Sequence, residues 1–348
     1  MPIQWNYPGI LAVLAILCIS FYLMRETLFS SLPDVFNPSI SQISLRSLLC
    51  VSILAAQRGG LEVKRVHDGK TKNVKDKDGG TINPVTDGDF RSHYVMMRTL
   101  VDAFPGLKVI SEEHDDALEA HHTSVYVGPV DKTCPSDVLA AIPYDTKIPL
   151  DHLQLWIDPL DATQEYTEDL LDYVTTMVGI AIKGRAVGGV IHKPFATAAN
   201  KKIFWAWKDQ GISENLKNSS PPNESLKIII SRSHSGNVDE TARTAFAGQT
   251  LEIIPAGGAG YKTVEVLTGR ANVYLHTTKI KKWDLCAPNG LLNAVGGRLS
   301  TLAGTEVDYT APVVANDVVN TGGVIAAVAD HATYVTAFST LNAAKPSR

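Results

Sequence analysis

The chain has 348 residues, of which 45% are hydrophobic, so it can bury the core of one α/β domain of about 300 residues. Its formal net charge of −4 is opposite in sign to the basic surface that a general nucleic-acid binder needs. Composition therefore argues against nucleic acid as a partner and leaves enzymes and binding proteins open. Nothing in the sequence indicates the oligomeric state.

The N-terminus has the features of a membrane anchor. Residues 10–24 are apolar except for one serine, and no charged side chain precedes Arg25. Trp5 and Tyr7 are of the kind that lie at membrane interfaces, and the apolar run is near the lower length limit for a spanning helix. A cleaved signal peptide is the alternative, but neither a basic start nor a small-residue cleavage site is evident. The predicted segments are a signal anchor over residues 1–25, a stem over 26–40 and one domain over 41–345.

Helices and strands are predicted to alternate along the rest of the chain. Apolar residues at helical spacing predict a first helix from Leu45 to Ala56, which we expect Gly59 and Gly60 to end. A second helix enters from Asp89 and stops at Pro105. Strands are predicted at 108–110, 153–157, 174–182, 186–192, 226–230, 251–254 and 271–275, and helices at 238–247, 261–268 and 285–295. This alternation predicts a mixed α/β sandwich.

Two features have no place in that scheme. Residues 115–150 contain several carboxylates without a recognised motif, and we interpret them as a surface excursion. Outside the predicted anchor, Cys50, Cys134 and Cys286 allow at most one intrachain disulfide. Which two cysteines pair, if any, stays open, because connectivity cannot be deduced from sequence alone.

Carboxylates are concentrated at three points of the chain. Asp158 and Asp161 lie at the end of the apolar run 153–157, Glu112 and Glu113 follow the strand at 108–110, and Asp284 opens the helix at 285–295. Carboxylates crowded at strand ends repel one another unless a cation lies between them, and Mg²⁺ takes such oxygen ligands. Each position taken alone also fits a simpler interpretation, which is a polar loop for the first two pairs and an N-cap for the last residue.

The order of these motifs resembles the lithium-sensitive, magnesium-dependent phosphatases of the inositol monophosphatase superfamily. Their pattern is a Glu-Glu strand end, then Asp-Pro-[Leu/Ile]-Asp-[Gly/Ala]-Thr, then Trp-Asp, which this chain matches at 112–113, 158–163 and 283–284. The resemblance covers roughly residues 41 to 340. It implies an α/β fold layered as α-β-α-β-α, with two or three Mg²⁺ ions between its two halves.

The resemblance also implies roles for individual residues. The implied Mg²⁺ ligands are the side chains of Glu112, Asp158, Asp161 and Asp284 and the carbonyl oxygen of Leu160. Asp89 would accept a hydrogen bond from Thr163, whose hydroxyl orients the attacking water and helps to deprotonate it. Glu113 would support this site or act as an additional ligand. The backbone N–H groups of Ala162 and Thr163 would receive phosphate oxygens.

Two later segments narrow the substrate. Residues 230–235 and 257–262 resemble the branch of this superfamily that removes the 3′-phosphate from 3′-phosphoadenosine 5′-phosphate. The substrate contacts predicted from them are Ser233, His234, Gly258 and Lys262. Lys262 would meet the 5′-phosphate with its ammonium group. The alternative is that Ser233 only caps the following helix and that Lys262 is a surface charge.

The compartment is also predicted from the resemblance. The hydrophobic N-terminus and several motifs resemble the Golgi-resident members of that branch, which implies a single-pass Golgi membrane protein with a lumenal catalytic domain. Arg25 would weakly leave its own side of the membrane cytoplasmic. We nevertheless favour the lumen, because Asn218 and Asn223 both begin glycosylation sequons in a polar surface loop.

Two other functions stay open. An inositol phosphate phosphatase would share the metal centre but bind a polyol in place of a nucleotide. A membrane-anchored binding protein that has lost catalysis is disfavoured, because every expected metal carboxylate and Thr163 are present in the sequence.

Overall fold

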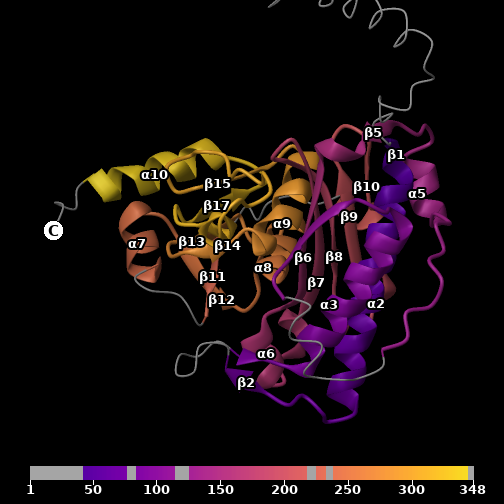
Figure 1. The fold of residues 1–348 in the computed structure, drawn as a ribbon. Coiled ribbons are helices and arrows are strands. Elements are labelled where there is room, and N and C mark those ends of the chain that lie inside the picture. The colour runs from indigo at the N-terminus through magenta and orange to yellow at the C-terminus, as the bar shows by residue number, and fades with distance from the viewer. Residues whose placement is uncertain (1–41, 77–83, 114–124, 218–224, 233–237, 344–348) are drawn as a thin grey trace, which may run out of the picture. The chain divides into compact units, whose positions relative to one another are not determined.

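A computed structural model describes residues 42–76, 84–113, 125–217, 225–232 and 238–343. Residues 42–348 form one compact unit, and the predicted anchor and stem lie outside the described residues. Within the described ranges, no helix combines the length and the hydropathy required to cross a bilayer. The predicted α/β class is confirmed, since helices and mixed sheets alternate along the chain (Figure 1).

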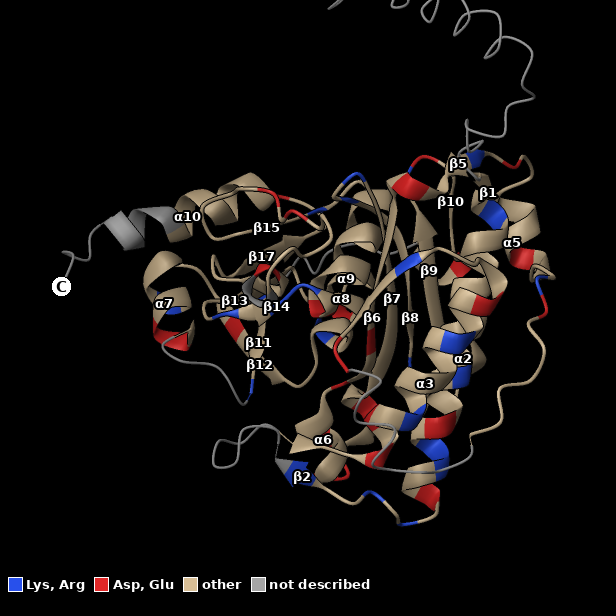
Figure 2. Ribbon diagram, viewed as in Figure 1, with Lys and Arg blue, Asp and Glu red and all other residues tan. Residues whose placement is uncertain are grey.

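A six-stranded sheet organises the first half of this unit. Its strand order is β10-β9-β8-β7-β6-β4, and all neighbours are antiparallel except β4 and β6. The strands are β4 Lys108–Ser111, β6 Leu153–Asp161, β7 Thr175–Ile182, β8 Arg185–His192, β9 Ile203–Trp207 and β10 Gly211–Ile212. Helices α2 (Leu45–Asp68) and α3 (Asp87–Ala103) cover one face and bury an apolar core against it. Figure 2 shows acidic and basic residues interspersed along these two helices.

A five-stranded sheet organises the second half. Its order is β12-β11-β13-β17-β15, with β11 parallel to both of its neighbours and β17 antiparallel to both of its own. The strands are β11 Leu226–Ser231, β12 Leu251–Ala256, β13 Val273–His276, β15 Arg298–Ser300 and β17 Val324–Ala327. Helices α7 (Val238–Ala245) and α10 (His331–Ala343) pack on its outer face.

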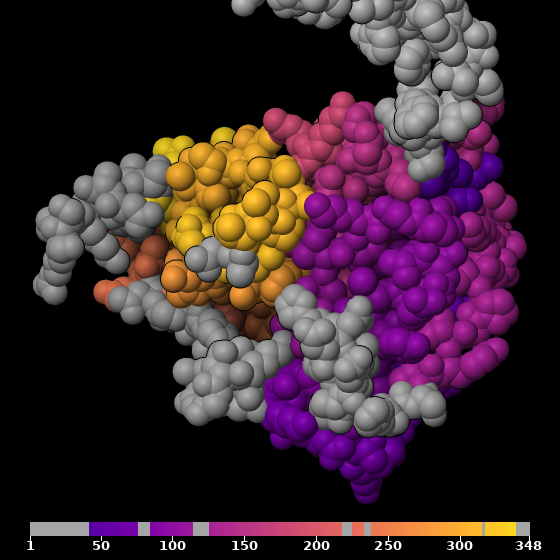
Figure 3. Space-filling model, in the orientation of Figure 1, coloured from indigo at the N-terminus to yellow at the C-terminus, as the bar shows by residue number. Residues whose placement is uncertain are grey.

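Two helices lie between the sheets and join the halves. They are α8 (Ala259–Leu267) and α9 (Trp283–Ala294), and they pack against each other and share one apolar core with both sheets. The layers of the unit therefore run helices, sheet, helices, sheet, helices (Figure 1). Figure 3 shows residues of the first half in direct contact with residues of the second.

Short elements complete the fold. The short helices are α5 Ser136–Ala141 and α6 Thr163–Thr167, with single turns at Leu150–His152, Leu171–Tyr173, Ala199–Lys201, Glu214–Leu216 and Ala315–Val318. The remaining strands form two-residue or three-residue pairs: β1 Gln42–Ser44 with β5 Lys147–Pro149, β2 Lys75–Asp76 with β3 Pro84–Val85, and β14 Ile280–Lys281 with β16 Val319–Asn320.

The predicted end of the first helix is wrong. Helix α2 does not stop at Gly59 and Gly60 but continues through them to Asp68. The two glycines serve clearance instead: a Cβ at Gly59 would lie 2.5 Å from the hydroxyl oxygen of Ser92 in α3, and a Cβ at Gly60 would overlap the ring of His192. Close packing of α2 against α3 and the sheet therefore requires glycine at both positions.

Candidate active site

The carboxylates of the first half meet where two parallel strands end. In the register of β4 and β6, Ser111 lies opposite Ile157, and the Glu112 N–H donates to the Ile157 carbonyl at 3.3 Å. Glu112 and Asp158 are therefore neighbours across the ladder. Asp158 is only 1% exposed, and its Oδ1 accepts a hydrogen bond from the Leu160 N–H at 3.0 Å. Burial of a carboxylate to this degree requires a compensating positive charge or a proton.

The acidic motif belongs to the strand and not to a loop beyond it. Strand β6 runs on to Asp161, so the interpretation of residues 158–161 as a polar loop is wrong. Asp158 pairs with Met177 and Asp161 pairs with Thr175, and the register of β6 and β7 shifts between these two pairs. Such an irregularity re-aims side chains at a strand end.

Asp161 is fastened to the first turn of α8. Its Oδ1 accepts from the Ala259 N–H at 3.0 Å, and its Oδ2 accepts from the Gly260 N–H at 2.8 Å and from the Thr175 hydroxyl at 3.0 Å. Gly258 precedes this turn with φ +63°, and a Cβ there would lie 2.7 Å from Asp161 Oδ2. The carboxylate thus satisfies the free amides of a helix N-terminus, which also favour its negative charge.

Asp284 brings a carboxylate from the second half. It lies in the first turn of α9, but the N-cap is Lys282, so the expected capping role of Asp284 is wrong. Burial, followed by the charges of Glu112 and Asp161, raises the pKa of Asp284 well above its ordinary value. These interactions place it near both carboxylates of the first half. A side chain released from capping is available for another ligand.

The electrostatics of the cluster favour a cation. Burial, then the charges of Glu112, Asp161 and Asp284, raise the pKa of Asp158 well above its ordinary value. Burial also raises the pKa of Asp161, although Lys262 and the α8 amides oppose that shift. Among the described residues, no three acidic, histidine or cysteine side chains stand in a ready-made metal geometry. The donor set nevertheless fits a hard divalent ion, because it consists of oxygen atoms and its members repel one another without one.

A second group of contacts surrounds Thr163. Its hydroxyl donates to Asp89 Oδ1 at 3.1 Å and lies 2.9 Å from the Leu160 carbonyl oxygen. Asp89 Oδ2 accepts from both the N–H and the hydroxyl of Thr86 at 2.7 Å, which closes a capping box at the start of α3. The predicted contact between Asp89 and Thr163 is confirmed. The capping box fixes the carboxylate on which the hydroxyl depends.

Comparison with known proteins agrees with this geometry. The model of the inositol monophosphatase family matches residues 44–333. The chain belongs to the inositol monophosphatase family. Among its relatives is the Golgi-resident adenosine 3′,5′-bisphosphate 3′-phosphatase of Rattus norvegicus, 45% identical over 278 residues, which are 77% of this chain and 75% of that protein.

One further relative agrees with this family, and one solved structure agrees with the fold. Inositol monophosphatase 3 of Xenopus tropicalis is 43% identical over 327 residues, covering 90% of this chain and 86% of that protein. The crystal structure of the extragenic suppressor protein suhB from Bartonella henselae shares the fold with a TM-score of 0.60 at 17% identity, covering 83% of this chain and 96% of that one. The family consists of phosphatases and is generally Mg²⁺-dependent.

Lys262 occupies an unexpected place in this family member. The alternative that it is a surface charge is wrong, because it is only 3% exposed. Burial lowers its pKa to about 8, although the charges of Asp161, Glu165 and Asp284 oppose that shift. Its Nζ lies 5.1 Å from the centroid of the Tyr274 ring. The lysine therefore provides the acidic cluster with a positive charge.

The remaining predicted site residues are Ala162, Glu113, Ser233 and His234. Ala162 is the N-cap of α6 with φ +71°, which directs the chain sharply from β6 into Thr163. Glu113 is 7% exposed at the end of β4. Ser233 and His234 lie outside the described residues, so their predicted contacts stay predictions.

Sequence reasoning missed Thr175 and Arg232. Thr175 is fully buried and binds Asp161 across the β6–β7 ladder. Arg232 follows β11 and reaches the first half, where its guanidinium lies 3.3 Å from Glu165 and 2.6 Å from Glu168. Both contacts join residues distant in sequence. The only available signal was a position at a predicted strand end, which many unrelated residues share.

Proposed function

We propose that this chain removes the 3′-phosphate of 3′-phosphoadenosine 5′-phosphate, giving AMP and phosphate, and thereby clears the by-product of sulfotransferases. The observation that carries the proposal is the acidic cluster of Glu112, Asp158, Asp161 and Asp284, with Thr163 bonded to Asp89 beside it. The similarity to the Golgi-resident adenosine 3′,5′-bisphosphate 3′-phosphatase supports the choice of substrate.

The cluster is suited to holding two or three Mg²⁺ ions. We assign the four carboxylates and the Leu160 carbonyl as ligands, with Glu113 as a support or additional ligand. The Leu160 oxygen lies 2.9 Å from the Thr163 hydroxyl, and a carbonyl oxygen has two lone pairs, so it retains capacity for an ion. Bound Mg²⁺ supplies the positive charge that screens the phosphate, acidifies water and stabilises the leaving oxygen.

Thr163 and Asp89 direct the water that attacks phosphorus. The Thr163 hydroxyl can donate to Asp89 at 3.1 Å or to the Leu160 carbonyl at 2.9 Å, and when it donates to Asp89 its lone pairs are free to accept a proton from water. Asp89 is held by the capping box and keeps the hydroxyl in that orientation. The backbone N–H groups of Ala162 and Thr163 follow at the start of α6, and we assign them to the oxygens of the reacting phosphate.

The second half would bind the nucleotide. Gly258 and Lys262 flank the first turn of α8, which follows the carboxyl end of β12 beside the parallel strand β11. Ser233 and His234 follow β11 in the sequence, and we assign them to the same substrate. Gly258 already lets the α8 backbone approach Asp161 closely. We assign the Lys262 ammonium to the 5′-phosphate of the substrate, supported by its burial beside the site.

We further propose a single-pass Golgi membrane protein whose lumenal domain spans residues 41–345, held by an anchor at 1–25 through a stem at 26–40. The name of the rat relative supports the compartment. On expression in cells, the protein should lose apparent mass on deglycosylation at Asn218 or Asn223 and stay with membranes in a carbonate wash. A protein without glycans that carbonate extracts contradicts the topology.

Phosphate release from the full chain tests the activity. We expect much faster release from 3′-phosphoadenosine 5′-phosphate than from inositol 1-phosphate at equal concentration, loss of activity in excess chelator, and inhibition by Li⁺. A faster reaction with inositol 1-phosphate would favour the second candidate, an inositol phosphate phosphatase. The observation behind that candidate is the 43% identity to inositol monophosphatase 3 of Xenopus tropicalis over 90% of this chain.

A further inference from the structure

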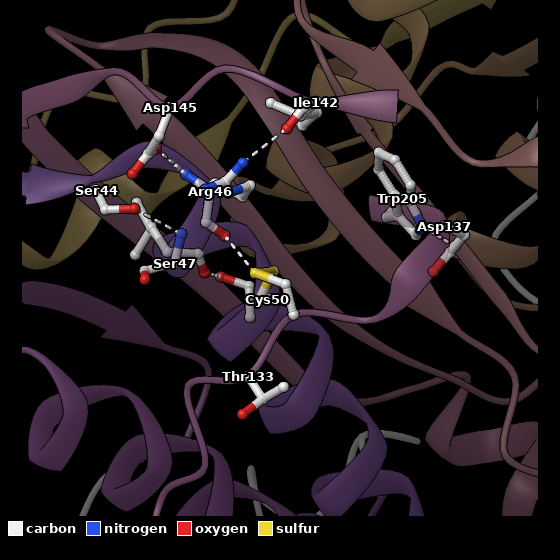
Figure 4. The surroundings of a disulfide bond; sticks show 12 residues. Ser44, Arg46, Ser47, Cys50, Thr133, Asp137, Ile142, Asp145 and Trp205 are labelled. Carbon is white, nitrogen blue, oxygen red and sulfur yellow. Dashed lines mark hydrogen bonds between the residues drawn. A yellow bond between two sulfur atoms is a disulfide. The ribbon is translucent and has the colours of Figure 1, made fainter. Parts of the chain in front are cut away.

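The segment that follows the acidic end of β4 is covalently tied to α2. Residues 125–135 have no regular secondary structure, yet Cys134 is disulfide-bonded to Cys50, with their Cα atoms 5.1 Å apart (Figure 4). The two cysteines are 84 residues apart in sequence. The free cysteine of the described residues, Cys286, is buried in the core between the sheets. The disulfide therefore restrains part of the predicted surface excursion at residues 115–150. The proposed reaction assigns no role to that segment.

Polar contacts also attach this segment to α2 and α3. The Arg58 guanidinium donates to the carbonyls of Gly128 at 3.2 Å and Pro129 at 2.8 Å. The Lys132 ammonium donates to the Ala103 carbonyl at the end of α3 at 2.6 Å. Both cations donate to backbone carbonyls and so fix the path of the segment, and the Lys132 Nζ also lies 4.8 Å from the centroid of the Phe104 ring. Half-buried and exposed polar contacts contribute little stability individually.

The segment is also attached beyond the disulfide. The Asp145 carboxylate accepts from the Arg46 N–H at 3.1 Å, and the Arg46 side chain donates to the Ile142 carbonyl at 3.2 Å (Figure 4). The Trp205 indole donates to Asp137 at 3.0 Å and joins α5 to the six-stranded sheet. The disulfide lies between these contacts and those of Arg58. Among the contacts between this segment and the rest of the unit in the described residues, the disulfide is the covalent one.

We propose that oxidation of Cys50 and Cys134 is a required maturation step that couples folding of the catalytic unit to an oxidising compartment. The inference rests on the lumenal location in the proposed function. In the reaction, the two thiols lose two protons and two electrons and form the S–S bond, while a disulfide oxidant of the lumen is reduced to a dithiol. Such a bond persists in the secretory lumen and is rare in the reducing cytosol.

The physical benefit is a more restricted unfolded chain. Val130 and Cys134 pack against the apolar core of the first half, but most of residues 125–135 are exposed or half-buried, so little hydrophobic burial holds them on α2 and α3. Closing a loop of 84 residues removes part of the conformational entropy of the unfolded state. Without the bond, residues 125–135 would be held by half-buried and exposed polar contacts and a few apolar ones.

Peptide mapping of the full chain, extracted from cell membranes with free thiols blocked before digestion, tests the bond directly. We expect one peptide pair containing Cys50 and Cys134 that separates on reduction. Recovery of both residues as blocked free thiols overturns the proposal. Hydrolysis of 3′-phosphoadenosine 5′-phosphate is measured on the same sample. A linked but inactive protein would contradict only the proposed function, and an active protein with free thiols would contradict only this inference.

Variants test whether the bond is required. Cys134→Ser changes a half-buried side chain, and we expect it to lower Tm by about 5–10 °C and to reduce the yield of folded protein. The double variant with Cys50→Ala should add little, because either change breaks the same bond. Thr133→Ala, on the neighbouring exposed residue, is the matched control and should leave Tm unchanged. A Tm of Cys134→Ser equal to that of the control overturns the requirement.

Discussion

The two halves of the molecule bring opposite charges to one site. The six-stranded half provides Glu112, Asp158 and Asp161, all at the ends of β4 and β6. The five-stranded half and its linking helices provide the α8 amides and the ammonium of Lys262, together with the one carboxylate of Asp284. Neither half contains both the full ligand set and its countercharge. The site therefore forms only when the halves pack against each other.

Asp158 and Asp161 belong to one motif, but they depend on the two halves in different ways. Burial and three neighbouring carboxylates raise the pKa of Asp158, and its carboxylate accepts a local hydrogen bond from the Leu160 N–H. Asp161 also lies in β6, but its carboxylate oxygens accept hydrogen bonds from two amides of α8 and from the Thr175 hydroxyl. The first carboxylate depends on a metal for charge balance, whereas the second also joins the halves mechanically.

The largest effect is expected from neutralising these carboxylates. Asp284→Asn and Asp161→Asn should each lower kcat by about 10³-fold, because each removes one charge from the metal site without changing its shape. Asp161→Asn should in addition lower Tm by several degrees, since its amide group would face the α8 N–H donors. Steady-state kinetics and thermal melts measure the two effects. Equal Tm values for the two variants would remove the joining role from Asp161.

A smaller loss of kcat is expected from a change at Thr163, which lies in the first half. Thr163→Val keeps the shape of the side chain but removes the hydroxyl that contacts Asp89 and that we assign to the attacking water. We expect kcat to fall by about 10²-fold while the Mg²⁺ concentration for half-maximal activity stays constant. Thr163→Ser restores a hydroxyl and should recover most of the rate. Full activity of Thr163→Val would show that Asp89 serves only the capping of α3 and that Thr163 takes no part in the reaction.

The contribution of the second half is tested on binding. Lys262→Met should raise KM for 3′-phosphoadenosine 5′-phosphate by about tenfold or more relative to adenosine 3′-monophosphate, because a charge-assisted bond to the 5′-phosphate is lost. The matched comparison is the same variant on both substrates. Equal changes on the two would assign Lys262 to balancing Asp161 and Asp284 alone.

The smallest effect is the rise in Tm on adding Mg²⁺, which we expect to depend on pH. Since burial and neighbouring charges raise the pKa values of Asp158 and Asp284, the folded protein binds more protons than the unfolded chain, and without Mg²⁺ its stability falls as pH rises through those pKa values. Mg²⁺ replaces these protons. A Mg²⁺ concentration one hundredfold above the Kd at pH 8 should raise Tm by about 5 °C at pH 8, and the same concentration should raise it by less at pH 5, where protons compete with the ion. A larger shift at pH 5 would contradict the charge assignment.

The division between the halves also explains what the sequence could predict. The carboxylates of residues 112–113 and 158–161 lie in short contiguous motifs next to predicted strands, so the family resemblance could bring them to one site. Thr175 and the disulfide partner of Cys50 were not predictable, because each contact depends on the register of distant segments. Asp284 was assigned to the metal site through the family resemblance, and its expected position as the cap of α9 is wrong, because the N-cap is Lys282.

Errors about glycine have a different origin. A glycine pair near the end of an apolar pattern indicates a helix end when only local preference is considered. In α2, tertiary packing overrides that preference, because Ser92 and Met96 of α3 leave no space for a larger residue at Gly59. The same close approach explains why Gly258 precedes α8.

The glycine pair of α2 has a consequence for the order of folding. Each glycine in a helix interior disfavours the helix by about 1 kcal/mol relative to alanine, so the middle of α2 is weak in isolation. Its stability comes from docking on α3 and His192, both of which are distant in sequence. We expect the N-terminal turns of α2 to form early and the region beyond Gly60 to consolidate only after the sheet is assembled. Amide exchange during refolding would then show late protection from Glu62 to Val66.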